Sequence, residues 1–571
     1  MAVDATAPRT HPLRRLWRRD LLTHPTGRAR AGNLALVVAV TISLYYQLYV
    51  GGAVATQVLA DFHMSFVYYT TVIAASSALG ALASLATGVT DRVGRANLVA
   101  YGTVVVSLIT AFGVPHAGTK LQLAFWLCAA GLVEGTVLVA TPALVRDFSP
   151  QVGRARAMAF WTMGPVLGSL IVSEVTSHTL GQLPTWQDQY RIAGYVGLVV
   201  AVVTLALLRE LHASLRNQVQ GALAARTQES PARPGPDGPE AARSPYRQML
   251  TPDIVGSSIA ISVFLLFYYT AVLFLPIFFE TSMGFTDGQA NGLLNWLWSA
   301  TVLSMLVFGV LSDRLRVRKP FMLVGGLATV AIDLAFVAEA GDRSPSYRSI
   351  AILLALSGVL SSAAYVPWMA SFTETVERRN PALTATGLAV WGWILRLVVA
   401  AAIIGLPHLV TSVTPLADDG AQVQAVATQT AKDFPRLYAE IQVHPEVFVQ
   451  LGAYASPQDI PAPVLSGALA TVGPEALAEL RNPKAQADLR FLGGKTAADV
   501  RTAQQETPGQ WRTWLWICAF GAIGFCPLIF LMAGAWRPAK RDDADTDADD
   551  VAGRDLAHQP GDVPSALPAQ P

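Results

Sequence analysis

The chain has 571 residues, of which 52% are hydrophobic and only 14% are charged, and its formal net charge is +1. The charged fraction is well below the roughly 25% of soluble domains, which argues against a soluble globular protein. The three cysteines, Cys128, Cys518 and Cys526, lie far apart in apolar segments and predict neither a disulfide framework nor a zinc cluster.

The first 30 residues form an arginine-rich tail that ends in "HPTGRAR". The apolar segment after this tail is too long for the hydrophobic region of a signal peptide, and "VLADF" gives no convincing cleavage site. We therefore expect this segment to be retained as a first membrane helix.

Long apolar segments recur along the rest of the chain. A membrane helix needs about 20 mostly apolar residues, and twelve segments of that kind occur in two groups of six. This pattern predicts an all-α polytopic membrane protein with two six-helix bundles, 31–209 and 253–410 completed by 511–536. The segments lie near 31–50, 66–87, 98–115, 121–145, 157–177, 192–209, 254–279, 287–311, 320–338, 349–372, 383–410 and 513–536.

The basic residues of the short connections predict the orientation, because Lys and Arg accumulate on the cytoplasmic side. With a cytoplasmic N-terminus, that side carries "DRVGR", "SDRLRVRK", "ERRN" and the tail 537–571 with "RPAKR". We therefore expect both termini in the cytoplasm and a multi-pass protein of the plasma or inner membrane. The short connections of the other side hold Lys120, Arg191, Arg343 and Arg348.

Two connections are long. Residues 210–252 include "PARPGPDGPEAARSP", a linker that is expected to be disordered. Residues 411–510 form a polar, Ala-rich extracytoplasmic insert in which "AQVQAVATQTAKDF" and "PEALAEL" look helical. The favoured interpretation is a cap without a ligand of its own; the alternative is a binding accessory.

A short motif occurs once in each half. Asp91-Arg92 and Asp313-Arg314 stand at the cytoplasmic ends of the second predicted helix in the two groups of six. Recurrence at matching positions of two halves is typical of an internally duplicated transporter.

These two loops resemble the signature G-x-L-x-D-R-x-G-R-R between helices 2 and 3 of the major facilitator superfamily. Thr87 replaces a glycine of the first copy, and Arg316 replaces one of the second. The residues that carry the resemblance are Asp91, Arg92, Gly94 and Arg95 in the first copy, and Gly309, Leu311, Asp313 and Arg314 in the second.

Two further stretches resemble the same family. "VEGTVLVATPALVRDFSPQVGRARAMAF" is similar to its helix 4–5 region, with Asp147, Pro150 and Arg154 in the expected places but Gly131 where an arginine is usual. "WTMGPVLGSL" resembles the helix 5 signature of antiporters, through Gly164, Pro165 and Gly168, with Ser169 where a second glycine is common. The missing arginine and the serine weigh against drug/proton antiport.

The resemblance implies a fold in which helices 1, 4, 7 and 10 line a central cavity, helices 2, 5, 8 and 11 flank it, and the others are peripheral. It also implies that ion pairs of the doubled loop motif latch one access state, since charges at helix ends pair well with neighbouring arginines. The alternative is that these arginines merely enforce the topology.

Three charged residues lie at membrane depth, where charges are rare and usually functional. Glu134, between Gly131 and Gly135, is a candidate for loading and releasing a proton; a structural hydrogen bond is the alternative. Arg396 offers a planar fork of donors that suits a carboxylate or phosphate. The alternative role of Arg396 is a permanent ion pair with Glu134 or with Asp333. We expect Asp333, on a peripheral helix, to be structural.

Polar and aromatic residues recur on single helical faces. Such stripes are candidates for cavity walls, although packing and interface anchoring are the alternatives. With Arg396, the candidate substrate-binding residues are Tyr45, Tyr268, Asn295, Trp298, Tyr365 and Trp368.

The sequence therefore favours proton-coupled secondary transport of a small organic anion by alternating access. Efflux of hydrophobic or cationic compounds is the first rival, and a non-transporting sensor or an enzyme in the insert is the second. The soluble parts contain no nucleophile–base set or metal-ligand cluster, and "GGKT" at 493–496 lacks the first glycine of a phosphate loop. We expect no cofactor, metal or nucleic-acid partner, and a monomer that binds substrate, protons and lipid.

Overall fold

The computed structural model describes most of the chain between residues 19 and 537. Asp91, Arg92, Pro150, Arg154, Arg343, most of the linker 210–252 and the tail after residue 537 lie outside the described residues. The described residues are 19–23, 25, 27–84, 94–149, 160–212, 215, 245–340, 346–380, 383–452, 454, 460–480, 482–530, 532, 534, 536 and 537.

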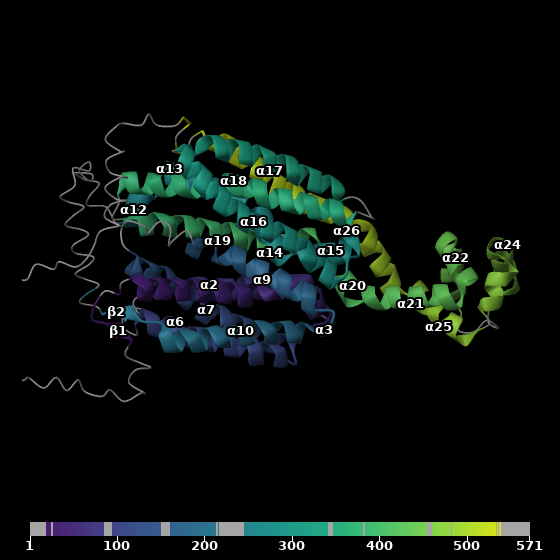
Figure 1. Cartoon of the computed structure of the whole chain (residues 1–571). Helices are drawn as coiled ribbons and strands as arrows, with labels where there is room; N and C mark the ends of the chain where they lie inside the picture. Colours follow the sequence, from purple (N-terminus) through teal and green to yellow (C-terminus); the bar gives the residue numbers. More distant parts are fainter. Residues whose placement is uncertain are drawn as a thin grey trace, which may run out of the picture.

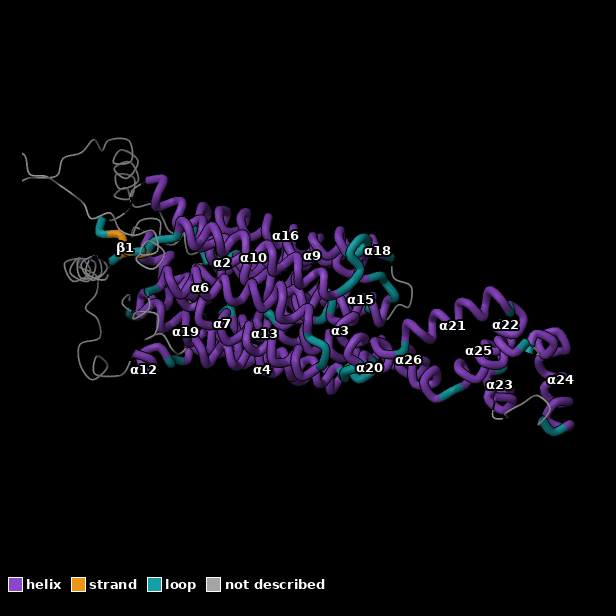
Figure 2. The backbone as a smooth tube through the Cα atoms, turned by 90° about the horizontal axis from the view of Figure 1, so that it is seen from below, coloured by secondary structure: helices purple, strands orange, loops and turns teal. Residues whose placement is uncertain are grey.

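The described chain is almost entirely helical, and most helices run side by side along one direction (Figure 1). The strands β1 (Asp20–Leu21) and β2 (Glu210–Leu211) lie at one end of this bundle, which we call the strand end. Helices α20 to α25 lie at or beyond the opposite end, which we call the insert end. Figure 2 shows the same order after a turn of 90°.

The described part of the first bundle contains seven helices and a helical extension. Its helices are α2 (Gly27–Ala53), α3 (Ala55–Phe62), α4 (Phe66–Ser84), α6 (Arg95–Leu108, continued by a π-turn Ile109–Gly113 and a 3₁₀ turn Val114–His116), α7 (Lys120–Phe148), α9 (Gly164–Thr179) and α10 (Trp186–Leu207).

The second bundle is completed by the last helix of the chain. Its helices are α12 (Pro245–Met249), α13 (Pro252–Phe264), α14 (Leu266–Leu273), α15 (Leu275–Met283), α16 (Asp287–Leu315), α17 (Lys319–Glu339), α18 (Tyr347–Arg379), α19 (Thr384–Leu409) and α26 (Lys495–Leu528). Local chemistry sets several of these ends. Thr286 and Gln289 form a reciprocal capping box at the start of α16.

Nine helices of the described residues are long and apolar enough to cross a membrane. The pair α13 and α14, bent by 42°, makes a tenth if it is one span. The two remaining predicted segments overlap α9 and the apolar part of α26. Each of the twelve predicted segments thus overlaps described helix, and the prediction of an all-α polytopic fold is confirmed.

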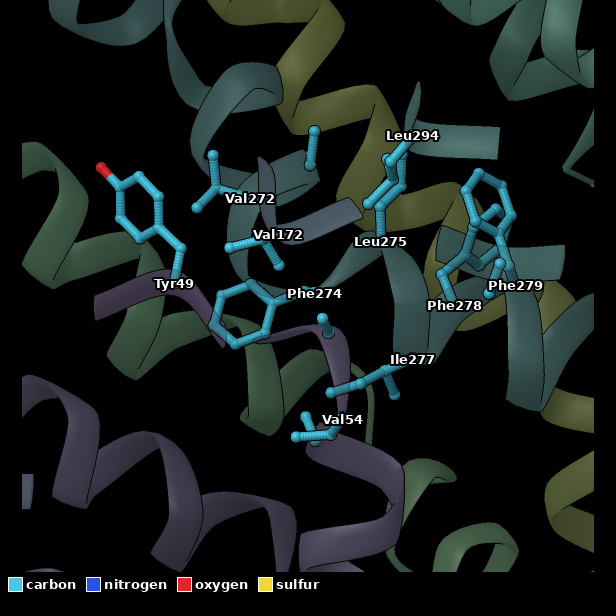
Figure 3. Close-up of a cluster of buried hydrophobic side chains, with 14 of the residues drawn as sticks. Tyr49, Val54, Val172, Val272, Phe274, Leu275, Ile277, Phe278, Phe279 and Leu294 are labelled. Atoms are coloured by element: carbon cyan, nitrogen blue, oxygen red, sulfur yellow. The ribbon is translucent and has the colours of Figure 1, made fainter. Parts of the chain in front are cut away.

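The two bundles share one hydrophobic core at the insert end. There Tyr49, Val54 and Val172 of the first bundle pack with Phe274 and Phe278 of the second (Figure 3). Towards the strand end each bundle keeps a separate core, around Val99 and Leu144 in the first and around Ile261 and Trp368 in the second. The bundles are therefore joined at the insert end and packed independently at the other.

The insert forms a small helical unit with its own core, which includes Phe434, Leu437, Ile441 and Phe448. Helix α26 runs unbroken from this unit into the second bundle, so the expected boundary at residue 510 falls inside one helix. The helices of the insert are α20 (Val413–Asp418), α21 (Gly420–Asp433), α22 (Pro435–Val443), α23 (Pro445–Gly452), α24 (Ala462–Glu479) and α25 (Pro483–Gly493).

Structure at the strand end extends beyond the predicted bundle limits. Strands β1 and β2 pair in parallel, with Asp20 opposite Glu210, although 210 begins the stretch expected to be a linker. The preceding Arg19 is buried; its guanidinium donates to Leu205 O (2.7 Å) and Leu208 O (3.2 Å) at the end of α10. A cation that caps the last carbonyls of a helix satisfies groups that have no partner within the helix.

Candidate functional site

A cavity of about 770 Å³ lies between the two bundles. Its walls include residues of α2, α4, α6, α7, α9 and α10 from the first bundle and of α13, α14, α16, α17, α18 and α19 from the second. Both halves of the chain therefore build one chamber. Six of the eight predicted substrate-binding and proton-coupling residues line it: Tyr45, Glu134, Tyr268, Trp298, Tyr365 and Arg396.

Arg396 lies in the wall of the cavity on α19 and forms no ion pair or hydrogen bond with any described residue. Neither Glu134 nor Asp333 is its partner, so the ion pair weighed as the structural alternative is not present here. Tyr45 lies within electrostatic reach of both Arg396 and Glu134. The planar fork of donors of an unpaired guanidinium can bind a carboxylate or phosphate that enters the chamber.

Glu134 is 4% exposed, and its Oε1 atom has no hydrogen-bond partner among the described residues. Its position follows from the close packing of α7 on α4. A Cβ atom at Gly135 would collide with the carbonyl oxygen of Gly80, and one at Gly131 would collide with the side chain of Ser76. The flanking glycines therefore let the two helices approach and hold the carboxyl group in the wall.

Aromatic rings cover much of the remaining wall. Tyr45 packs on Tyr49 with ring centroids 5.4 Å apart, and Tyr268 packs on Trp298 at 5.3 Å. Gly168 permits this arrangement on the side of α9, because a Cβ atom there would lie 2.6 Å from Tyr45 Cβ. Among its described lining residues, the chamber thus combines one cation, Arg396, and one carboxyl group, Glu134, with several aromatic rings.

Two predicted site residues lie outside the cavity wall. Asn295 Nδ2 donates to Ser177 Oγ (3.0 Å) and joins α16 to α9. Trp368 is buried in the core of the second bundle, where Nε1 donates to Ser257 Oγ (2.9 Å) and the ring stacks on Phe372. Both residues have structural partners, and we leave them out of the proposed site.

Comparison with known proteins gives the family. Residues 36–401 match the Major Facilitator Superfamily. This chain belongs to that superfamily.

The efflux pump radE of Floropilus chiversii is 26% identical over 290 residues, which are 49% of this chain and 53% of the pump. The match thus spans about half the length of that relative. Among solved structures, a bacterial homologue of the human lysosomal transporter Spinster, inward-facing, is similar in fold, with a TM-score of 0.53 at 15% identity over 90% of this chain and 100% of the other. The partially occluded inward-open xylose transporter XylE from E. coli gives 0.50 at 12% identity, over 66% and 92%.

As a member of the major facilitator superfamily, the chain is a multi-pass membrane transporter with the two-bundle fold. The resemblance found in the sequence is confirmed, and with it the expectation that helices of both halves surround a central cavity. Alternating access needs one closed and one open face. In this structure the shared core closes the face at the insert end.

The loop motif of the first half is held by carboxylates from two other segments. Arg95 pairs with Asp147 of α7 (2.8 Å), and its backbone N–H donates to Glu210 (2.7 Å). Gly94 precedes α6 with a φ of 93°, a conformation that glycine adopts readily. The described part of this superfamily motif therefore ties α6 to α7 and to β2 within one bundle.

The second copy uses a different arginine. Asp313 pairs with Arg318 (2.7 Å), which also contacts Glu374 of α18 (3.0 Å), whereas Arg314 and Asp313 are exposed. The described contacts of both copies lie within single bundles. The latch that the superfamily suggests remains a prediction, since Asp91 and Arg92 lie outside the described residues.

The sequence analysis missed two residues, one that holds the loop motif and one that lines the cavity. Glu210 stabilises the start of α6 but stands in the segment expected to be a linker. Trp391 lines the cavity one and a half turns before Arg396, and its Nε1 atom has no described partner. The stretch "VWGWILR" held the signal for Trp391, whereas nothing local marked Glu210.

Among the described residues there is no group of three or more His, Cys, Asp or Glu side chains placed to bind a metal.

Proposed function

We propose that this transporter moves a small organic anion by alternating access and couples its movement to protons. The observation that carries the proposal is the guanidinium of Arg396, which faces the central chamber without a partner among the described residues. A charge at this depth needs a counter-charge or water, and a carboxylate or phosphate matches the donor fork of arginine.

The same chamber supplies a group for the proton. Glu134 is buried and forms no hydrogen bond with a described residue, so a negative charge on it would be poorly solvated in this state. A conformational change that exposes the Glu134 side chain to water favours release of its proton. Tyr45, another residue of the chamber wall, lies within electrostatic reach of both charged groups.

The bundles supply the two access states. At the insert end, Asn291 Nδ2 donates to Ala53 O (3.0 Å) and Gln57 donates to Asp287, so contacts between the halves close that face. Opening these contacts while the strand end closes would carry the chamber to the other side. We place the strand end in the cytoplasm of a plasma or inner membrane, as the basic connections predict.

Export of hydrophobic or cationic compounds is the second candidate. Two observations favour it: the similarity to the efflux pump radE and the aromatic walls around Tyr45, Tyr268 and Trp298. An exporter of this kind has no need for a free cation in its chamber, since like charge repels a cationic substrate. We therefore rank it below anion transport.

Uptake into proteoliposomes tests the proposal, with and without an imposed pH gradient, over a panel of carboxylates and lipophilic cations. We expect flux of an anion, dependent on the gradient, in the wild type. Arg396→Ala should abolish it and Arg396→Lys should retain part of it. The exposed Arg512, in α26, gives the matched control Arg512→Ala, which should leave flux unchanged.

The second arm concerns Glu134. Glu134→Gln should retain binding of the anion but lose the response to the pH gradient. Carboxylate flux that survives Arg396→Ala, or flux confined to the lipophilic cations, would overturn the anion proposal in favour of efflux.

A further inference from the structure

The cavity wall on α19 includes residues that also belong to the outer face of the bundle. Trp393, Leu397 and Ile404 are 48%, 62% and 54% exposed, and their spacing places them on one side of the helix. In a membrane protein such an apolar exposed stripe faces lipid. Trp393 and Leu397 nevertheless line the cavity, whereas Ile404, nearer the insert end, does not.

Helix α4 repeats this pattern. Val67 and Leu82 are 38% and 62% exposed, and Ala78 lies on the same face between them. Ala78 and Leu82 line the cavity, but Val67, nearer the insert end, does not. On both helices, then, the lipid-facing stripe merges with the chamber wall in the half nearer the strand end.

The two helices pack against each other. Near the insert end, Phe66 and Tyr69 of α4 lie in the shared core with Ile403 and Leu406 of α19. These buried residues fill the contact between α4 and α19 at the insert end. Nearer the strand end, Leu82 and Leu397 line the chamber and share a helical face with exposed residues outside it, which points to a side opening of the chamber between α4 and α19.

Arg396 stands at this side opening. It is the residue before Leu397 and lies less than one turn from Trp393, and its side chain is exposed as well as part of the cavity wall. A cation at the mouth thus has aromatic rings on the inner side and apolar lipid-facing side chains on the outer side. This arrangement matches a molecule with an anionic head and an apolar tail.

We infer that the substrate is an amphipathic organic anion that enters from the lipid through the opening between α4 and α19. Its head pairs with Arg396, and its apolar part passes Leu82 and Leu397 to lie against the tyrosines of the chamber. This inference rests on the proposed anion transport and narrows its substrate class. A small hydrophilic anion would gain nothing from an apolar side entrance, whereas each methylene held in an apolar setting strengthens binding about fourfold.

Alkyl sulfonates test the inference because they stay ionised and do not cross a bilayer unaided. The full chain is reconstituted in proteoliposomes, and uptake of radiolabelled sulfonates with four, eight and twelve carbons is measured, with alkyl trimethylammonium ions of the same lengths as the cationic arm. Alkyl phosphates form a further arm that distinguishes head groups. We expect KM to fall at least tenfold from the four-carbon to the twelve-carbon sulfonate.

Leu397→Ser makes the mouth polar and should raise KM for the twelve-carbon sulfonate about tenfold, with little effect on the four-carbon one. Ile404→Ser is the matched control: it changes the same stripe of α19 outside the cavity and should alter neither. Equal transport of all three sulfonates, or no effect of Leu397→Ser, would overturn the lipid-side entrance while anion transport stands. Transport of the ammonium series alone would overturn both.

Discussion

The backbone N–H of Phe66, the first residue of α4, donates a hydrogen bond to Thr414 Oγ1 at 3.0 Å. Phe66 belongs to the first bundle and Thr414 to α20 of the insert. The first N–H groups of a helix have no partner within it, so the insert satisfies a group of the opposite half. Val413 next to it is fully buried in the shared core. The insert is therefore part of the contact that closes this face.

Thr414→Val should weaken this closure. Valine keeps the volume but removes the acceptor, at a cost of about 1 kcal/mol, or roughly a fivefold shift towards opening. Hydrogen exchange of the first turn of α4 measures the change and should be about fivefold faster. Thr428→Val in α21 is the control, because that hydroxyl bonds to Gln424 O of its own helix. Equal exchange in both variants would show that α20 does not hold the closed face.

The pair of His63 and Asp418 should make this closure depend on pH. Burial raises the pKa of Asp418, its neighbour Asp419 adds to the rise, and His63, 3.6 Å away, opposes it. A carboxyl group with a raised pKa in the closed state binds its proton more readily there, so closure is strongest at acid pH and weakens as pH rises through that pKa. Spin labels at residues 121 and 428 should therefore report more of the closed distance near pH 4 than near pH 7.

Asp418→Asn should remove this dependence, since the amide carries no charge to bury. The same labels, with the native cysteines replaced, should then show the closed distance across the whole range. Asp433→Asn gives the comparison: its carboxylate is exposed and pairs with Lys484, which lowers its pKa, so the pH response should persist. A pH response that survives in Asp418→Asn would contradict the assignment of the pH dependence to Asp418.

Gly135→Ala should separate α7 from α4. The added Cβ atom would meet the Gly80 carbonyl oxygen, and overpacking of this kind destabilises by about 1–3 kcal/mol. Thermal unfolding should show a lower Tm, and transport should fall because Glu134 shifts with the helix. Gly405→Ala in α19 meets no atom within 4 Å and should leave the Tm unchanged or slightly higher. A Tm for Gly135→Ala as high as that of the control would refute the close-packing argument.

Asp147→Asn should destabilise the first bundle. The Arg95–Asp147 pair is largely buried, and removal of one partner of a buried pair costs about 3–5 kcal/mol. The double variant Arg95→Gln with Asp147→Asn should recover part of this loss. Arg191→Gln, which breaks a more exposed pair with Asp188, should cost less than about 1 kcal/mol. Denaturant unfolding compares the three, and equal losses for Asp147→Asn and Arg191→Gln would contradict the structural role.

The sequence predicted the membrane helices and their grouping because apolar length is a local property. It also located Glu134 and Arg396, since charges at membrane depth stand out against apolar neighbours. It could not assign faces, because both sides of a membrane helix are apolar. Tyr365 reaches the cavity, but Trp368, three residues on, turns into the core of its own bundle.

Contacts between distant segments were equally hidden. No local pattern pairs Glu210 with the start of α6, or Thr414 with α4. The break between α14 and α15 has a local cause, because Pro276 has no N–H to donate to Val272 O. The bend of 42° between α13 and α14 is not explained by any glycine or proline near Leu265.

The shared core of Figure 3 has a thermodynamic consequence. Parting the bundles at the insert end would wet Phe274 and its apolar neighbours, at about 25 cal/mol for every square ångström exposed. Opening this face is therefore costly unless contacts formed at the strand end, or by whatever the chamber holds, offset that exposure. The cargo thus acts on the cycle through the difference in its binding free energy between the two access states.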